Sequence, residues 1–294
     1  MMSDSRKGKG ARISVIERIV TVFLLGYGMH YLGYFLRARY FTWLGTLSMD
    51  EGVRHSLQYL GHLVFLAVLL IYAWAVRKDR KYILSFLHGK ASRNLLLALC
   101  GAVFGFLMMG ICIFAASVHG DLVIELSGNL QIPVFILAAI AVFIQASTEE
   151  IESRAFVFGK MHEEGVPFVW AASVSAFFFS YLHAANPGFG FLPLLSIFVV
   201  GLQYILCYHY FGSIWFCCTA HMMWNFTQDF IFGLPDSGKP AVVSVFSTTV
   251  KGSGFFYDPT FGIEGSVMAI LANLIACGLI ILIGRGLRKR ALKG

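Results

Sequence analysis

Three short motifs in the sequence set acidic, basic, imidazole and amide side chains at helical spacing. In chain order they are Glu149, Glu150 and Arg154; Phe179 and His183; and His221 and Asn225. Residues four apart lie on one face of a helix, so Glu150 would be presented with Arg154, Phe179 with His183, and His221 with Asn225. Carboxylate, imidazole and amide groups are the side chains that move protons and stabilise oxyanions during catalysis.

The first motif predicts two different tasks for its two acids. Glu150 precedes Arg154 by four residues with the acid first, which is the favoured order for an ion pair on a helix. Glu149 lies about 100° round the helix and does not share that arginine. It is therefore the carboxylate free to accept a proton from water, which Gln145 would orient from one turn earlier. The alternative is a salt-bridged helix end at the membrane surface.

The other two motifs offer nitrogen donors and acceptors. The ring of Phe179 is spaced to pack against His183 and fix its orientation, although an interfacial histidine would show the same spacing. His221 and Asn225 would hold two donors side by side, as an oxyanion requires. A half metal site or a hydrogen bond between helices are the alternatives for this pair.

The three motifs together favour chemistry over three separate structural roles. Each lies in a different apolar stretch, where polar groups need partners, and the simplest solution is that they face one another. A base, an imidazole and a pair of oxyanion donors around one pocket suit the hydrolysis of an amide bond.

The stretches that carry the motifs are typical of membrane helices. Only 13% of the 294 residues are charged, against roughly 25% in soluble domains, which predicts a polytopic all-α membrane protein. A span needs about 20 apolar residues, and eight stretches qualify: 17–36, 58–76, 94–117, 132–158, 167–184, 191–210, 213–233 and 266–284. We expect a single membrane domain over residues 1–294, with the motifs on the helices of 132–233.

Charge predicts how the chain is oriented. The net charge of +7 comes from basic clusters at the chain ends and in the loop 77–93, which is typical of cytoplasmic flanks and gives no indication of nucleic-acid binding. We expect a multi-pass protein of the cell membrane, in contact with the lipid bilayer, with both termini cytoplasmic and 234–265 as an extracytoplasmic loop. Four histidines near span ends or without helix-spaced partners are interpreted as interfacial or structural: His30, His62, His88 and His209. Three arginines are expected to reach the membrane surface or to belong to an interfacial helix: Arg37, Arg39 and Arg54.

The order of EExxxR, FxxxH and HxxxN on separate membrane helices resembles the CPBP family. These are the CAAX-processing and bacteriocin-processing intramembrane endopeptidases, also called Abi proteins. The resemblance covers about 132–233, and the stretch 261–266 also resembles bacterial members.

The resemblance implies a role for each motif residue. It implies that Glu149 is the general base, that His183 helps to hold and activate the water, and that His221 and Asn225 form the oxyanion hole. Glu150, Arg154 and Phe179 would support them. We expect no cofactor, because no HExxH spacing is present. A zinc-dependent peptidase is the alternative, since two histidines and carboxylates are available.

The leading hypothesis is an intramembrane endopeptidase that cleaves a peptide precursor or a membrane protein with water activated by glutamate. The rival from another class is a non-catalytic membrane partner, in bacteriocin immunity or sensor-kinase regulation, that uses the same cavity for binding. A proton-coupled transporter would use Glu149 and His183 as a relay, but the sequence has no repeated half-structure to favour it.

Overall fold

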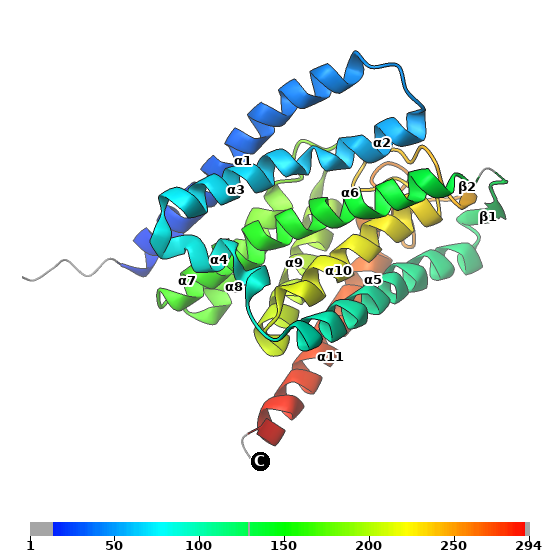
Figure 1. Cartoon of the computed structure of the whole chain (residues 1–294). Helices are drawn as coiled ribbons and strands as arrows, with labels where there is room; N and C mark the ends of the chain where they lie inside the picture. The colour runs from blue at the N-terminus through cyan, green and yellow to red at the C-terminus, as the bar shows by residue number, and fades with distance from the viewer. Residues whose placement is uncertain (1–13, 129, 292–294) are drawn as a thin grey trace, which may run out of the picture.

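A computed structural model describes residues 14–128 and 130–291. The described chain is almost entirely helical (Figure 1). Its α-helices and strands are α1 (Val15–Gly45), α2 (Glu51–Leu60), α3 (His62–Ala75), α4 (Arg80–Ile83), α5 (Ala91–His119), β1 (Leu122–Leu126), α6 (Ile132–Glu150), α7 (Gly159–Glu163), α8 (Phe168–Tyr181), α9 (Phe191–Phe211), α10 (Ile214–Phe226), β2 (Phe246–Val250) and α11 (Val267–Ala291). Short 3-10 turns are η1 (Arg77–Asp79), η2 (Ser85–Leu87) and η5 (Ile263–Gly265), and π-helical segments are η3 (Ile151–Phe158) and η4 (Thr227–Ile231).

The prediction of a polytopic all-α membrane protein is confirmed. Six helical stretches of the described chain are long and apolar enough to cross a membrane: Val15–Gly45, Glu51–Ala75, Ala91–His119, Ile132–Glu163, Phe191–Phe211 and Val267–Lys289. The other two predicted spans also form helices. Helix α8 has 14 residues and rises only about 20 Å, which is less than the hydrocarbon core of a bilayer. Helix α10 has 13 residues and continues directly into the π-helical segment η4, which ends at Ile231.

The helices that carry the motifs lie at the centre of the bundle. In Figure 1, α6 and α10 run side by side, with the α1–α3 hairpin on one side of them and α5 on the other. Gly101 and Gly105 of α5 lie directly against α10, where an added Cβ would collide with the backbone carbonyl oxygens of Phe216 and Ala220. Small residues at this spacing let two membrane helices approach closely. Thr219 strengthens the contact by donating a hydrogen bond to the Ala98 carbonyl at 2.7 Å.

The loop predicted to be extracytoplasmic, 234–265, meets the segment that follows α5 in a small antiparallel sheet. Strand β1 follows α5 and strand β2 lies within the loop 234–265, with Leu122 opposite Val250. The pairing brings both loops to the same end of the bundle, at the right of Figure 1. The long loop is therefore a structured part of the molecule that is fixed beside the motif helices.

Candidate active site

The two acids of the first motif are the last residues of α6, and the helix changes its winding directly after them. Glu150 ends α6, and Arg154 lies within the π-helical segment η3. The predicted ion pair forms, with Arg154 Nε 3.1 Å from Glu150 Oε2, and both side chains are fully buried. Single π turns often occur at functional sites. Here the turn carries a permanently charged guanidinium into the protein interior beside its counter-ion.

Aromatic rings surround the buried guanidinium of Arg154. Its central carbon lies 4.0 Å from the centre of the Phe179 ring and 5.3 Å from that of Tyr204. Such cation–π contacts are strongest where water is excluded. Phe179 also packs against His183, with ring centres 5.1 Å apart, as the spacing predicts. One phenylalanine thus supports both the arginine and the imidazole.

Glu150 fixes the protonation pattern of His221. His221 Nδ1 lies 2.9 Å from Glu150 Oε1, and because an ionised carboxylate only accepts hydrogen bonds, Nδ1 must carry a hydrogen. The other ring nitrogen, Nε2, faces Glu149 Oε2 at 3.9 Å and the Asn225 amide nitrogen at 3.3 Å. Glu150 Oε1 therefore accepts a hydrogen bond from the imidazole, and Oε2 forms an ion pair with the Arg154 guanidinium without a hydrogen bond.

Gln145 links the base to the amide of the third motif. Its amide nitrogen donates to Glu149 Oε1 at 2.8 Å, and its oxygen accepts from Asn225 Nδ2 at 3.1 Å. An ionised carboxylate accepts hydrogen bonds and donates none, so the Gln145 group that faces Glu149 must be its NH₂. The Gln145 oxygen then faces Asn225, whose NH₂ group must be the donor. Gln145, which the sequence analysis expected to orient a water molecule, contacts Glu149 directly in the structure. The Asn225 amide nitrogen consequently points at His221.

His183 lies in the turn that follows α8, and its ring is held by the backbone. Nδ1 donates to the Phe179 carbonyl at 3.0 Å, so Nε2 is left as an acceptor. Both His183 and His221 line a cavity of about 10 Å³, together with Ser237 and Glu264. This is close to the volume that one buried water molecule needs. No ion pair within 4 Å joins His183 to Glu149 in the described chain.

The structure brings all seven motif residues into one region between α6, α8 and α10. We call five of them the motif cluster: Glu149, Glu150, Arg154, His221 and Asn225. Phe179 and His183 lie directly beside this cluster, because the Phe179 ring packs on both Arg154 and His221.

His62 is a member of the site that the sequence analysis missed. It begins α3, and its Nε2 atom lies 3.3 Å from Glu149 Oε1 and 3.3 Å from an Arg37 nitrogen. Its Nδ1 donates to the Tyr59 carbonyl at 3.0 Å. The structure places His62, interpreted above as interfacial or structural, beside Glu149, with Arg37 in contact with it. No helical spacing links them to the motifs, so the sequence held no local signal.

A second buried group of acids fastens the long loop to the bundle. We call it the loop cluster: His55, Tyr59, Asp229, Asp236 and Glu264. Asp229 Oδ2 lies 2.6 Å from His55 Nε2, and the Tyr59 hydroxyl lies 2.7 Å from both Asp229 and Asp236. One hydroxyl has a single hydrogen to donate, so the two acids compete for it.

Glu264 connects the loop cluster to the cavity of His183 and His221. Its carboxylate accepts from the Trp224 ring nitrogen at 2.8 Å and from the Ser237 hydroxyl at 2.5 Å. Burial, together with the nearby charge of Asp236, raises the pKa of Glu264 to about 7. The loop therefore contributes an acid that titrates near neutral pH to the wall of the cavity.

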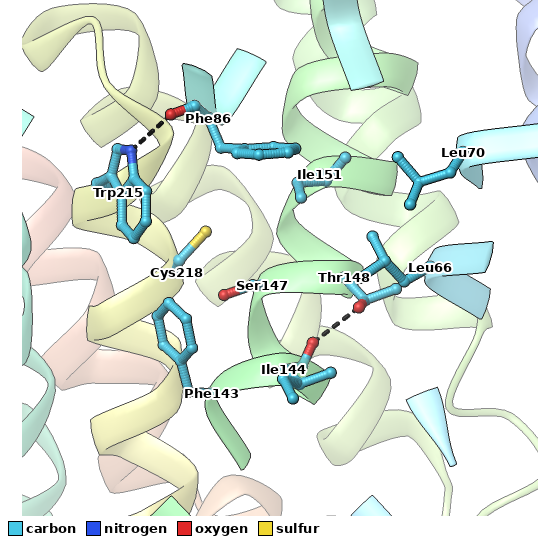
Figure 2. A pocket seen from close by; sticks show the side chains of 10 residues that line it. All are labelled: Leu66, Leu70, Phe86, Phe143, Ile144, Ser147, Thr148, Ile151, Trp215 and Cys218. Carbon is cyan, nitrogen blue, oxygen red and sulfur yellow. Dashed lines mark hydrogen bonds between the residues drawn. The ribbon is translucent and has the colours of Figure 1, made fainter. Parts of the chain in front are cut away.

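An apolar cavity of about 260 Å³ lies on the other side of α6 (Figure 2). Ile144, Ser147, Thr148 and Ile151 form its wall at helical spacing, and the Thr148 hydroxyl is satisfied by the Ile144 carbonyl at 2.7 Å. Glu149 projects from the opposite side of the same helix. This cavity therefore suits an apolar chain and lies apart from the carboxylates.

The described residues include no group of three His, Cys, Asp or Glu side chains placed to hold a metal ion. Zinc sites in proteins use at least three such ligands.

Comparison with known proteins identifies the family of this segment. Residues 129–227 match the family model described as Type II CAAX prenyl endopeptidase Rce1-like. That segment is about a third of the chain, and it contains every residue of the motif cluster. No curated protein matches the chain. The resemblance expected from the three motifs is confirmed over these residues, where the segment that carries the site matches the Rce1-like CAAX protease family model.

Proposed function

We propose that this protein is an intramembrane endopeptidase in which Glu149 activates water to hydrolyse a peptide bond. The observation that carries the proposal is the contrast between the two neighbouring acids. Both acids leave Oε2 buried without a hydrogen-bond partner among the described residues. Glu150 Oε2, however, lies 3.1 Å from the permanent cation of Arg154, whereas the ion-pair partner of Glu149 Oε2 is His221 at 3.9 Å. A buried carboxylate oxygen without a partner is costly unless it has a function.

The free oxygen of Glu149 lies where a water molecule could be held by two acceptors. Its distance of 3.9 Å from His221 Nε2 is too long for a direct hydrogen bond and suits a bridging water. His183 Nε2 is an acceptor as well, because Nδ1 is bonded to the backbone. Water held by Glu149 and His183 through its two hydrogens keeps its oxygen lone pairs free for attack on a carbonyl carbon.

The reaction then follows the ordinary course of amide hydrolysis. Glu149 takes one proton from the water as the oxygen attacks, the tetrahedral intermediate collapses, and the carbon–nitrogen bond breaks. Glu149 returns the proton to the leaving amine, so the products are a carboxylic acid and an amine.

The oxyanion of the intermediate requires a rearrangement of the third motif. Asn225 Nδ2 is engaged by Gln145 and His221 at 3.1 and 3.3 Å. We expect Asn225 to exchange its contact with His221 for a hydrogen bond to the oxyanion when substrate binds. An amide donor in that role is worth about 10²–10³-fold in rate.

The substrate class follows from the surroundings of the site. The motif helices belong to a membrane bundle, and the apolar cavity beside α6 would accept a lipid-like chain (Figure 2). We propose a membrane-associated protein or a peptide precursor as substrate, in keeping with a family described by prenylated CAAX termini.

The decisive experiment compares wild type with the Glu149→Gln variant. Gln keeps the size of the side chain but accepts no proton, so we expect cleavage to fall by about 10²–10⁴-fold. Peptides released from membranes that contain each form, measured by mass spectrometry, identify the substrate and the cleavage site at once.

Glu152→Gln is the matched control, since Glu152 is buried three residues further on and is bonded to His30 at 3.1 Å, away from the cavity. We expect its peptide profile to equal that of wild type. Identical profiles from wild type and Glu149→Gln, with both proteins folded, would instead favour a non-catalytic binding role.

A further inference from the structure

A polar cavity of about 440 Å³ lies at the end of the bundle that carries the basic loop 77–93. Its lining residues come from segments that follow or close candidate membrane spans, which end at Ala75, Glu163 and Phe211. The ends of membrane spans lie where the hydrocarbon core gives way to the polar head groups. The cavity is therefore at the depth of the lipid phosphates.

Several donors in the wall of this cavity have no acceptor among the described residues. Ser85 Oγ is buried without a partner, and the imidazoles of His88 and His162 make no hydrogen bond in the described chain. His209 Nε2 lies 2.8 Å from an Arg288 nitrogen, and because a guanidinium only donates, the hydrogen of a neutral His209 is on Nδ1. A ligand with several acceptor oxygens would satisfy these donors.

The charge around the cavity favours an anion. Glu163 is the one acid among the described residues that line it, and Lys81 and Tyr82 already hold this carboxylate. Arg288, which contacts the cavity wall through His209, forms no ion pair with an acid in residues 14–128 and 130–291. Basic pockets between membrane helices at this depth suit the phosphate of an anionic lipid.

An apolar cavity of about 370 Å³ adjoins the polar one across the segment 85–89. Ser85 and His88 line the polar cavity, whereas Phe86, Leu87 and Gly89 line the apolar one. The first turns of α5 supply much of the remaining apolar wall. A polar and an apolar cavity divided by one short turn match the two ends of a phospholipid.

Neighbouring helices fix the turn between the two cavities. Trp215 of α10 donates from Nε1 to the Phe86 carbonyl at 2.8 Å (Figure 2), and Asn94 of α5 donates to the His88 carbonyl at 2.7 Å. Both cavities are therefore formed before a ligand arrives, which lowers the cost of binding.

We propose that these two cavities bind one anionic phospholipid, with its phosphate among the donors of the polar cavity and one acyl chain in the apolar cavity. The second chain would remain in the bilayer against the exposed face of α5. The lipid would join η2 to the ends of α7, α9 and α11. The site is separate from the motif cluster, so the inference does not depend on hydrolysis by Glu149.

Lipid binding is measured on the full-length protein in an uncharged detergent by native mass spectrometry. The probes are dioctanoyl phosphatidylglycerol, dioctanoyl phosphatidylcholine and inorganic phosphate. One basic group near an anionic lipid contributes on the order of fivefold in affinity. We therefore expect phosphatidylglycerol to bind at least about fivefold more tightly than phosphatidylcholine, and inorganic phosphate to bind more weakly than either lipid.

Arg288→Gln should lower the preference for phosphatidylglycerol about fivefold, because it removes the unpaired cation beside the polar cavity. Arg285→Gln is the matched control, since Arg285 is an exposed arginine of the same helix that does not line the cavity, and it should leave the preference unchanged. Ala91→Trp fills the apolar cavity from its exposed edge and should weaken the binding of both lipids about tenfold. All three changes alter exposed side chains, so the variants should fold.

Equal affinity for the two lipids would overturn the inference. An equal loss in Arg285→Gln and Arg288→Gln would overturn it as well, because the preference would then come from surface charge and not from the cavity. Inorganic phosphate that binds as tightly as the lipid, in wild type and in Ala91→Trp, would assign the polar cavity to a soluble phosphate compound and refute the lipid site.

Discussion

The motif cluster and the loop cluster both bury several acids, but they stabilise them in different ways. In the motif cluster a buried arginine neutralises Glu150, with 3.1 Å between Nε and Oε2. In the loop cluster no ion pair with lysine or arginine occurs among the described residues, and the acids depend on the donors of His55, Tyr59, Trp224 and Ser237. The motif cluster stabilises its acid by an ion pair, whereas the loop cluster stabilises its acids by hydrogen bonds from uncharged donors and from His55.

We expect this difference to suit only the motif cluster to the proposed catalysis. Glu150 is paired with both Arg154 and His221, whereas Oε2 of the neighbouring Glu149 has no hydrogen-bond partner among the described residues and lies 3.9 Å from His221. The acids of the loop cluster compete for few donors, and burial raises the pKa of Asp236 as well as that of Glu264. Carboxyls of that kind hold a loop in place and make poor permanent anions.

Neutralising an acid should therefore have opposite effects in the two regions, and the largest effect is expected for Glu150→Gln. The change leaves the Arg154 guanidinium buried without a counter-ion, which costs about 3–5 kcal/mol. Thermal unfolding in detergent, followed by tryptophan fluorescence, measures the loss.

The double variant Glu150→Gln/Arg154→Met supplies the control for that result, because it removes both charges together. We expect it to recover most of the stability. If the double variant is as unstable as the single one, then charge balance is not what holds the motif cluster.

Asn225→Ala should affect the reaction more than the fold. Loss of the amide donor is expected to lower kcat by about 10²–10³-fold with little change in KM, as for a donor that acts in the transition state. Asn273→Ala is the matched control, since Asn273 is a buried asparagine on α11 bonded only to the Ala269 carbonyl of its own helix. A parallel loss of activity in both variants would contradict the assignment of Asn225.

Glu264→Gln should stabilise the protein at alkaline pH. The folded protein holds the Glu264 proton up to about pH 7, whereas the ordinary value of the pKa is 4.5. Between these values the folded state binds more protons than the unfolded state, so the stability of the wild type falls as the pH rises. The Gln side chain does not titrate, so the variant avoids this loss. Its free energy of unfolding should exceed that of the wild type by up to about 3 kcal/mol at pH 8 and should be almost the same at pH 4.5. A lower melting temperature at pH 8 would mean that the charged form is needed.

The smallest expected effect belongs to Ser237→Ala. It removes the hydroxyl that donates to Glu264 at 2.5 Å, and a single hydrogen bond of this kind contributes about 1 kcal/mol. In the Glu264→Gln background, Ser237→Ala should cost less stability than in the wild type, because the Ser237 hydroxyl there donates to a neutral acceptor. Thermal unfolding of the four proteins at pH 8 gives the coupling between the two residues.

The sequence predicts the helices of the membrane domain well because hydropathy acts locally. Each of the eight predicted spans is a helix in the structure, and the errors lie in length. The segment after Ala146 remains helical through Glu163 although Glu149, Glu150 and Arg154 are charged, since these side chains find partners in the interior. Hydropathy does not report which residues pair with these charges in the fold, so it does not predict where this helix ends.

The candidate site was predictable only where its residues follow helical spacing. The contacts of Glu150 with Arg154 and of Phe179 with His183 were expected from four-residue intervals. His62 and Glu264 come from segments about 90 and 110 residues away from Glu149 in sequence, and only tertiary packing brings them to the site. Their roles depend on long-range contacts, for which a single sequence carries no periodic signal.

The close contact of Gly101 and Gly105 with α10 has a consequence for how a substrate enters. Because backbone meets backbone there, α10 cannot slide or rotate on α5 without collision, and the wall that carries His221 and Asn225 is fixed. The cavity between His183 and His221 admits little more than a water molecule. A peptide must therefore enter by displacing the opposite wall, formed by α1, α3 and the long loop. We expect that wall to open before a peptide bond can reach Glu149.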